Sequence, residues 1–489
     1  MKKKTSDTIF FVLVLALSIR LIFAFSKSIY HDEAMYLAYS YFAGFNPVNF
    51  LYLADYSQFW GGTIFSSLLP LVIDRIFFTI MPIELGVRIG KILAGIGSVY
   101  LVYLISKNNK AGLIAASIVA FNSATIFVDF LKFEAYSTFF LLLGCYFLME
   151  KDKRKFSGIA FFASFLMKYS SAVQIIVILL IFLIISKKKE REEVIKAGII
   201  TAVLIGTFMM FHTNQLEKLR EVSDFYKAWK EVTVMNPQAV GTPAQILFEG
   251  TIKPTLIFLS PIIALLVISL REIKKDENLV WLAGGISIVV YLNIGMPSYV
   301  FFNQYLTSAV PFFAIIAGEA LSKMKKDIVY AGVGIFVIIN LLNSFSLIDF
   351  PVVRPLLFAS PDWRPAVNFL KMRNFNEGNM LATQHAAIWF YLDSNKADIV
   401  KYNSPENLPQ RINLENKIEI KTSAESVGLE ETLSNYKYVI YFSSKEMMPS
   451  WTAFITSEMV SLIEQELYNT NYYESPPYQV LIFKNRLLI

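Results

Sequence analysis

Six charged residues interrupt stretches of sequence that are otherwise apolar and aromatic: Asp32, Glu33, Arg88, Asp129, Glu134 and Lys168. A carboxylate within reach of a hydroxyl group can act as a general base. A cation that is partly shielded from water can bind an anionic group. Neither kind of chemistry is possible unless the fold brings these side chains to the same place, so the elements that carry them have to be identified first.

The composition predicts an integral membrane protein. Of the 489 residues, 55% are hydrophobic and 17% are charged, against about 25% charged in ordinary soluble proteins. The net charge of +6 fits loops that face a cytoplasmic leaflet better than it fits a nucleic-acid surface. The single cysteine, Cys145, excludes a disulfide framework. His31, His212 and His385 lie too far apart for a structural Cys/His metal cluster.

Clusters of basic residues give the topology, because loops rich in Lys and Arg stay on the cytoplasmic side. The clusters are Lys2–Lys4, Lys107 with Lys110, Lys151–Lys155, Lys187–Lys196, Arg271–Lys275 and Lys323–Lys326. If each is cytoplasmic, the chain crosses out and back between them, and one last apolar run, Ile328–Ile348, ends outside. This predicts a polytopic α-helical protein of about eleven spans in the cell membrane, with a cytoplasmic N-terminus.

The first outer loop, residues 26–87, is predicted to follow a retained first span, Ile9–Phe25, and to precede a return span, Arg88–Ser106. The stretch Trp60–Met81 is interrupted by charges, and we expect it to be interfacial or partly inserted. The span before Lys168 has roughly 13 residues, fewer than the roughly 20 needed, so Lys168 is expected to be recessed below the outer surface. All six charged residues then lie toward the outer face.

The composition changes after residue 348, and the predicted domains are therefore 1–348 and 349–489. The second part is slightly acidic and has strand-like runs at Tyr438–Phe442 and Tyr478–Phe483. An amphipathic helix is expected at Trp363–Leu370. These features predict a C-terminal extracytoplasmic α/β domain. This domain has neither a glycine-rich phosphate loop nor a GxGxxG motif, so no cofactor is assigned to it.

Each charged residue also has a purely structural interpretation. Asp32 and Glu33 could cap or flank an interfacial helix. Arg88 and Lys168 could extend to the lipid headgroups. Asp129 and Glu134 are five residues apart, do not share a helix face, and could pair separately with Lys132 or water. No single one of these signals is specific.

Taken in order, several segments resemble the GT-C glycosyltransferases, enzymes dependent on polyprenyl-phosphate sugars that include protein mannosyltransferases and lipid A aminoarabinose transferases. Tyr30–Tyr36 (YHDEAMY) resembles the acidic motif of their first loop. Glu84–Gly97 resembles their segment with an arginine before the second span, and Phe165–Ser171 their lysine-bearing turn. Asn303–Pro311 resembles a late Arg-Tyr segment, with Gln304 where relatives often carry arginine. The similarity lies in the predicted transmembrane domain, residues 1–348.

This resemblance implies transfer of a sugar from a polyprenyl-phosphate donor, with inversion, to an acceptor hydroxyl on a protein, lipid or glycan. Lys168 would hold the donor phosphate, with Arg88 as a second contact or a structural ion-pair partner. Asp32 would be the general base. Glu33 would orient the loop or bind a neighbouring cation.

The remaining assignments of the resemblance are substrate contacts. Asp129 and Glu134 would bind sugar or acceptor hydroxyls, and Tyr305 is assigned to substrate binding as well. The second outer loop has no DxD motif, which argues against an obligatory metal ion. The long outer loop, residues 212–253, is either a solvated connector or a lid over the lipid-donor cavity.

Two other functions remain open at this point. A transporter or lipid flippase with an accessory outer domain should have two similar halves and charges near the membrane midplane. The sequence lacks that similarity between halves, and its charges lie near one face. An inactive relative that serves as a binding or assembly subunit is the other alternative.

Overall fold

The structure is a computed structural model that describes residues 2–26, 33, 67, 69–81, 83–106, 108–211, 267, 276–291, 302–344, 364, 380–382, 438–444, 467–475 and 478–485. The chain divides into two compact units. The first unit comprises Met1–Phe25 and Phe45–Leu356, and the second comprises Ser26–Gly44 and Leu357–Ile489.

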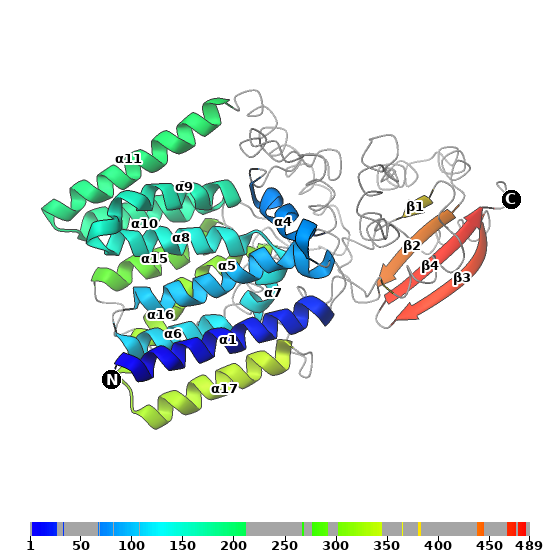
Figure 1. Ribbon diagram of the computed structural model, residues 1–489, viewed down its shortest axis with the longest axis horizontal. Helices are drawn as coiled ribbons and strands as arrows, with labels where there is room; N and C mark the ends of the chain where they lie inside the picture. The colour runs from blue at the N-terminus through cyan, green and yellow to red at the C-terminus, as the bar shows by residue number, and fades with distance from the viewer. Residues whose placement is uncertain are drawn as a thin grey trace, which may run out of the picture. The chain divides into compact units, whose positions relative to one another are not determined.

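The first unit is helical in all the elements that the structure describes (Figure 1). Its helices are α1 Lys2–Ser26, α4 Leu69–Ile80, α5 Ile83–Ile105, α6 Asn109–Phe121, α7 Ser123–Leu131, α8 Glu134–Met149, η2 Lys151–Phe156, α9 Ser157–Met167, α10 Ser171–Ile185, α11 Lys188–Phe211, α15 Asp276–Val290, η5 Phe302–Ala309, α16 Val310–Ser322 and α17 Lys326–Ser344.

Within the described residues, three helical segments are long and apolar enough to cross a membrane: Asp7–Ser26, Glu84–Ile105 and Glu190–Phe211. A fourth crossing results if the bent pair α6–α7 counts as one span. The first two correspond to the spans predicted at 9–25 and 88–106. Helix α4 has 12 residues, fewer than the roughly 20 needed to cross. Shorter apolar helices, such as α8, α10 and α16, complete the bundle.

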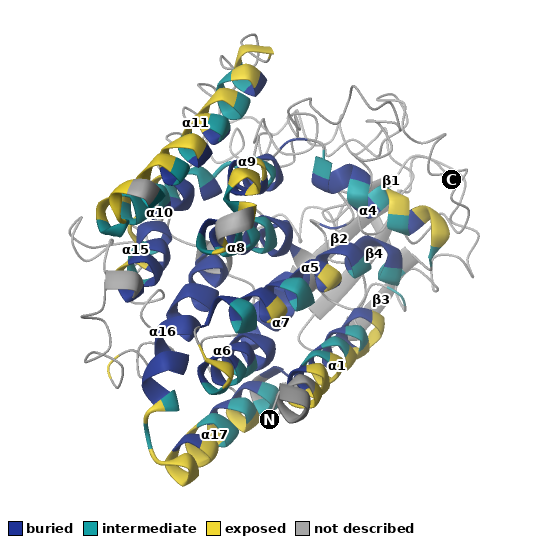
Figure 2. Cartoon of the chain, turned by 60° about the vertical axis from the view of Figure 1, so that its left-hand side comes forward, coloured by how far each residue is buried: buried dark blue, intermediate teal, exposed yellow. Residues whose placement is uncertain are grey.

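Burial separates the inner helices from those that form the surface of the bundle (Figure 2). Helix α16 is buried along nearly its whole length and packs against α6, where Gly318 lies close to the Ala111 carbonyl. By contrast, α1, α11 and α17 carry large exposed apolar side chains, among them Phe11 and Phe211, which is 82% exposed. Such a surface would be unfavourable in water and suits contact with lipid acyl chains.

Helices α6 and α7 meet at an angle of 65° around Asn122. The Asn122 side chain accepts a hydrogen bond from the Thr125 backbone N–H, and it therefore caps the start of α7. The break leaves carbonyl groups in the last turn of α6 without helical donors. The Thr125 hydroxyl donates to one of them, the Val119 carbonyl, at 2.6 Å.

A buried asparagine of α17, Asn340, forms hydrogen bonds with the first residue after this break. The Asn340 Oδ1 atom accepts hydrogen bonds from the Ser123 backbone N–H at 3.0 Å and from the Ser123 hydroxyl at 3.1 Å. Its amide group donates to the Phe336 carbonyl within α17. The side chain thus links the last described helix of this unit to the first residue of α7.

The described part of the second unit contains a four-stranded sheet. Its strands are β1 Met380–Ala382, β2 Tyr438–Ser444, β3 Leu467–Ser475 and β4 Tyr478–Asn485, in the order β1-β2-β4-β3. β1 and β2 are parallel, and the other pairs are antiparallel. The register of β3 on β4 shifts between Asn469 and Asn471, which indicates a bulge.

Both predicted strand runs are confirmed, because 438–442 lies in β2 and 478–483 lies in β4. Of the predicted helix at 363–370, Arg364 is described and is helical. The Arg364 guanidinium donates to the Ser26 carbonyl at 2.9 Å, and both residues belong to the second unit. The rest of that predicted helix lies outside the described residues.

Replacing Asn340 by alanine should destabilise the protein. Two hydrogen-bonding groups of Ser123 would lose their acceptor in a buried site, at a cost of about 1–3 kcal/mol for each group that is left unsatisfied. Thermal unfolding of the purified protein in detergent measures this, with Ile338→Ala on the exposed side of α17 as the control. Equal unfolding temperatures for the two variants would contradict the role of Asn340.

Candidate functional site

Among the residues that the structure describes, three buried ion pairs cross between helices of the first unit: Arg20 with Asp129, Lys91 with Asp74, and Lys168 with Glu134. They connect α1 with α7, α5 with α4, and the α9–α10 turn with α8. Ionised groups are costly to bury in an apolar bundle unless each is matched by a partner of opposite charge. The residues of these pairs are therefore candidates for a functional site.

The Arg20–Asp129 pair lies beside the broken helix. Arg20 is fully buried, and its Nε and Nη2 atoms donate to Asp129 Oδ2 at 2.8 and 2.6 Å. Its Nη1 atom donates to the Ala120 carbonyl at 2.9 Å. Ala120 is in the last turn of α6, so Arg20 supplies a donor to another carbonyl that the break leaves without a helical partner.

The Lys91–Asp74 pair is completed by a tyrosine. The Lys91 ammonium lies 2.5 Å from Asp74 Oδ2, and the Tyr136 hydroxyl donates to Asp74 Oδ1 at 2.7 Å. Lys91 also donates to the Val87 carbonyl at 2.5 Å. Gly90 gives the Tyr136 hydroxyl the space to approach α5, because a Cβ at this position would overlap it. Both carboxylate oxygens of Asp74 are thus engaged.

The Lys168–Glu134 pair lies where two helices end. Lys168 is the C-terminal cap of α9, and Glu134 is in the first turn of α8. The Lys168 ammonium donates a hydrogen bond to Glu134 Oε1. The other carboxylate oxygen, Oε2, is buried and has no hydrogen-bond partner among the residues that the structure describes.

Hydroxyl groups fix the helices around this pair. The Ser164 hydroxyl donates to the Ser137 carbonyl at 2.8 Å, and the Ser137 hydroxyl lies 3.2 Å from the Ser164 carbonyl. Ser67, just before α4, donates through its backbone N–H and its hydroxyl to the Leu166 carbonyl. α4, α8 and α9 are therefore held together by residues of α9 that lie within four positions of Lys168.

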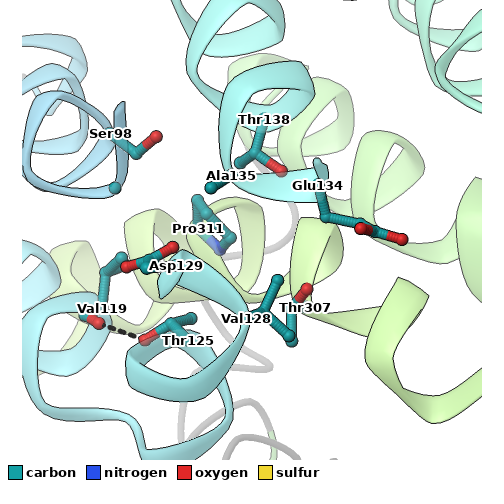
Figure 3. A pocket seen from close by; sticks show the side chains of 11 residues that line it. Ser98, Val119, Thr125, Val128, Asp129, Glu134, Ala135, Thr138, Thr307 and Pro311 are labelled. Atoms are coloured by element: carbon teal, nitrogen blue, oxygen red, sulfur yellow. Dashed lines mark hydrogen bonds between the residues drawn. The ribbon is translucent and has the colours of Figure 1, made fainter. Parts of the chain in front are cut away.

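A small pocket lies next to Glu134 (Figure 3). Its walls come from α5, the α6–α7 pair, α8, η5 and the start of α16, and the lining residues are Gly95, Ser98, Val119, Thr125, Val128, Asp129, Glu134, Ala135, Thr138, Thr307 and Pro311. It has room for about one water molecule and is too small for a sugar. The Glu134 carboxylate points away from Asp129, so the two side chains do not converge on one point in this pocket.

The structure thus places the predicted site residues unequally. Arg88 is fully buried and donates to the Ala24 carbonyl at 2.5 Å. Glu33 is 1% exposed and belongs to the second unit. Asp32 and the long outer loop lie outside the described residues. Tyr305 lies in η5, but its side chain is outside the description.

Sequence reasoning gave no role to Arg20, Asp74 or Lys91, although they take part in two of the three pairs. The sequence does indicate a role for Arg20, because an arginine inside a predicted membrane span requires a partner of opposite charge or a hydrogen-bond acceptor. Within the described part of the chain, no group of three or more His, Cys, Asp or Glu side chains could hold a metal ion.

Comparison with known protein families finds a match that covers part of the chain. A family model described as dolichyl-phosphate-mannose-protein mannosyltransferase matches residues 67–214. This segment contains Arg88, Asp129, Glu134 and Lys168. None of the curated proteins matches the sequence significantly.

Solved structures with a similar fold cover most of the chain. The apo structure of ArnT from Cupriavidus metallidurans has a TM-score of 0.60 at 11% identity and covers 96% of this chain and 97% of that one. The same enzyme bound to undecaprenyl phosphate has a TM-score of 0.59 at 11% identity, covering 97% of each chain. The archaeal oligosaccharyltransferase AglB from Archaeoglobus fulgidus, in complex with an inhibitory peptide and a dolichol-phosphate, has a TM-score of 0.52 at 10% identity, covering 98% of this chain and 74% of that one.

The matching family segment and the shared helical fold agree with the resemblance to GT-C glycosyltransferases that the order of the motifs predicted. The shared fold is a membrane-protein fold with several apolar helices. The comparisons give no support to the transporter alternative.

Neutralising only one partner of the Arg20–Asp129 pair should destabilise the protein strongly. Arg20→Met or Asp129→Leu leaves a buried charge without its partner, at a cost of about 3–5 kcal/mol, whereas the double variant removes both charges and should recover most of the loss. Unfolding of all four proteins in detergent gives the coupling energy. Additive losses in the double variant would show that the two residues act independently.

Proposed function

We propose that the protein transfers a sugar from a polyprenyl-phosphate donor to an acceptor hydroxyl at the outer membrane face, with inversion at the anomeric carbon. The matching family is described by a dolichyl-phosphate-linked mannose. Two solved structures of similar fold hold undecaprenyl phosphate and a dolichol-phosphate. The observation that carries the proposal is a recessed lysine, Lys168, inside the family segment and at a helix end.

Lys168 is suited to bind the donor phosphate for physical reasons. It is 9% exposed, so its ammonium is largely shielded from water, and a charge-assisted hydrogen bond to phosphate gains strength from that shielding. Its backbone is extended at the break between α9 and α10, so the side chain emerges from a turn and not from a continuous helix. Arg88 is better suited to the structural role, because its guanidinium donates to a carbonyl of α1.

The proposed reaction is a direct displacement at the anomeric carbon. The acceptor oxygen forms the new bond while the bond from that carbon to the phosphate oxygen breaks, and the electron pair leaves with the phosphate. Asp32 accepts the proton of the acceptor hydroxyl. Glu33 is almost fully buried, which favours a role in orienting its loop. Asp129 and Tyr305 remain proposed contacts to sugar or acceptor.

Contacts between basic loops support the proposed topology. The Lys110 ammonium donates to the Ser322 carbonyl at 2.6 Å, which joins the loop at 107–110 to the loop that begins at 323. Arg154 and Glu190 lie 3.2 Å apart and join two further basic clusters. Basic loops that meet at one end of the bundle fit a common cytoplasmic side in a protein of about eleven spans.

The second unit supports an outer location for the C-terminal domain. Its two parts, 26–44 and 357–489, form one compact unit, so both belong on the same side of the membrane. The first of them follows the first span of a chain with a basic N-terminus. We therefore assign the sheet-containing domain to the outer side, as an α/β domain that presents or positions the acceptor.

Lys168→Met should reduce the release of polyprenyl phosphate by about 100-fold, because it removes a cation that stabilises the charge developing on the leaving group. Purified protein is incubated with polyprenyl-phosphate sugars, and the lipid phosphate released is quantified. Lys153→Met, at an exposed lysine of η2, serves as the matched control. Full turnover of the Lys168→Met variant would exclude Lys168 from the donor site.

Asp32→Asn should abolish transfer and leave donor binding intact. Loss of a general base lowers the rate by about 10²–10⁴-fold, whereas the neutral amide keeps the size of the side chain. Turnover and binding of undecaprenyl phosphate are measured on the same preparation, with and without EDTA. Normal turnover by this variant would remove Asp32 from the mechanism, and loss of wild-type turnover in EDTA would contradict a metal-independent reaction.

A further inference from the structure

The two buried lysine–carboxylate pairs next to α8 differ in how fully the carboxylate is hydrogen-bonded. Asp74 has Lys91 on one oxygen and the Tyr136 hydroxyl on the other. Glu134 has Lys168 on one oxygen, and its second oxygen is buried without a partner in the described part of the chain. The first pair has the arrangement of a permanent structural link, and the second does not.

This difference has a physical meaning. A buried ion pair is stable when further hydrogen bonds satisfy the remaining lone pairs of the carboxylate. A buried carboxylate oxygen without such hydrogen bonds destabilises the arrangement that holds it. An incomplete pair therefore resists separation less than a complete one. Glu134 also has an alternative environment close by, because the hydroxyl-bearing residues Thr138 and Thr307 line the same small pocket.

We propose that Glu134 is an exchangeable counter-ion of Lys168. This inference rests on the proposed function, in which Lys168 binds the donor phosphate. In the absence of a lipid phosphate, Glu134 neutralises the Lys168 ammonium. When the phosphate arrives, it takes the place of Glu134 on Lys168, and the carboxylate turns toward the pocket. After transfer, the return of Glu134 to Lys168 helps the polyprenyl phosphate to leave.

The proposal gives Glu134 a different role from the hydroxyl contact that the sequence suggested, and the two roles predict opposite effects. If Glu134 holds a substrate hydroxyl, its removal does not strengthen the binding of a lipid phosphate that carries no sugar. If Glu134 competes for Lys168, its removal increases the fraction of protein that is ready to bind phosphate, and apparent affinity rises with that fraction.

The test uses the full-length protein purified in detergent and undecaprenyl phosphate as the probe. Binding is followed by intrinsic tryptophan fluorescence, and each variant is checked by thermal unfolding. We expect Glu134→Gln to lower the dissociation constant about tenfold, because one competing charge is lost from a shielded site. Lys168→Met should weaken binding, and the double variant should bind as weakly as Lys168→Met alone.

Asp74→Asn is the matched control, since it neutralises the other buried carboxylate that is paired with a lysine. This variant should have a lower unfolding temperature than wild type, and it should bind undecaprenyl phosphate no more tightly than wild type does. Glu134→Asp keeps the negative charge but shortens the side chain, so its affinity should lie between those of wild type and Glu134→Gln. This variant keeps the test decisive if Glu134→Gln does not fold.

The outcomes separate this inference from the proposed function. If wild type binds undecaprenyl phosphate and Lys168→Met weakens binding, but the Glu134 variants bind no more tightly than wild type, the counter-ion role is wrong and the function stands. If binding is absent, or is the same in Lys168→Met as in wild type, Lys168 is not the phosphate ligand and both proposals fail. Tighter binding that persists in the double variant would also overturn the exchange.

Discussion

The structure depends on one constraint: a charged side chain inside an apolar helical bundle has to be matched by a partner from another helix. Arg20, Lys91 and Lys168 meet this requirement with Asp129, Asp74 and Glu134. Each pair determines which helices are neighbours, because moving either helix would leave a buried charge without its partner. The apolar contacts of the bundle are far less selective, since apolar side chains can pack against many alternative neighbours and against lipid.

The same constraint explains why helix ends carry the chemistry. Asp129 lies near the end of α7, Glu134 at the start of α8, and Lys168 just after α9. α8 and α9 run in opposite directions, so the start of one meets the end of the other, and the serine hydrogen bonds between them preserve that alignment. A continuous helix satisfies its own backbone, whereas a break creates polar groups that need side chains. The α6–α7 break is therefore surrounded by Arg20, Thr125 and Asn340.

Much of the fold was predictable from composition and pattern, and the partners in the site were not. Apolar length predicted α1 and α5, and short apolar runs rich in β-branched and aromatic residues predicted β2 and β4. These are local properties that a few consecutive residues determine. The partner of Asp129, Arg20, is 109 residues away in the sequence. No local sequence pattern shows that Asp129 pairs with Arg20 and not with Lys132, which is only three residues from it. The resemblance to GT-C glycosyltransferases could be recognised because the order and spacing of the motifs persist along the chain, and the family match and the shared fold agree with it.

The central claim is that Lys168 binds the phosphate of a lipid-linked donor at a site that Glu134 occupies in its absence. The most direct test is an experimental structure of the full-length protein with undecaprenyl phosphate bound. We expect a phosphate oxygen about 3 Å from the Lys168 ammonium, with the Glu134 carboxylate turned away from it. A phosphate bound elsewhere, with the Lys168–Glu134 pair intact, would contradict both the role of Lys168 as phosphate ligand and the exchange with Glu134.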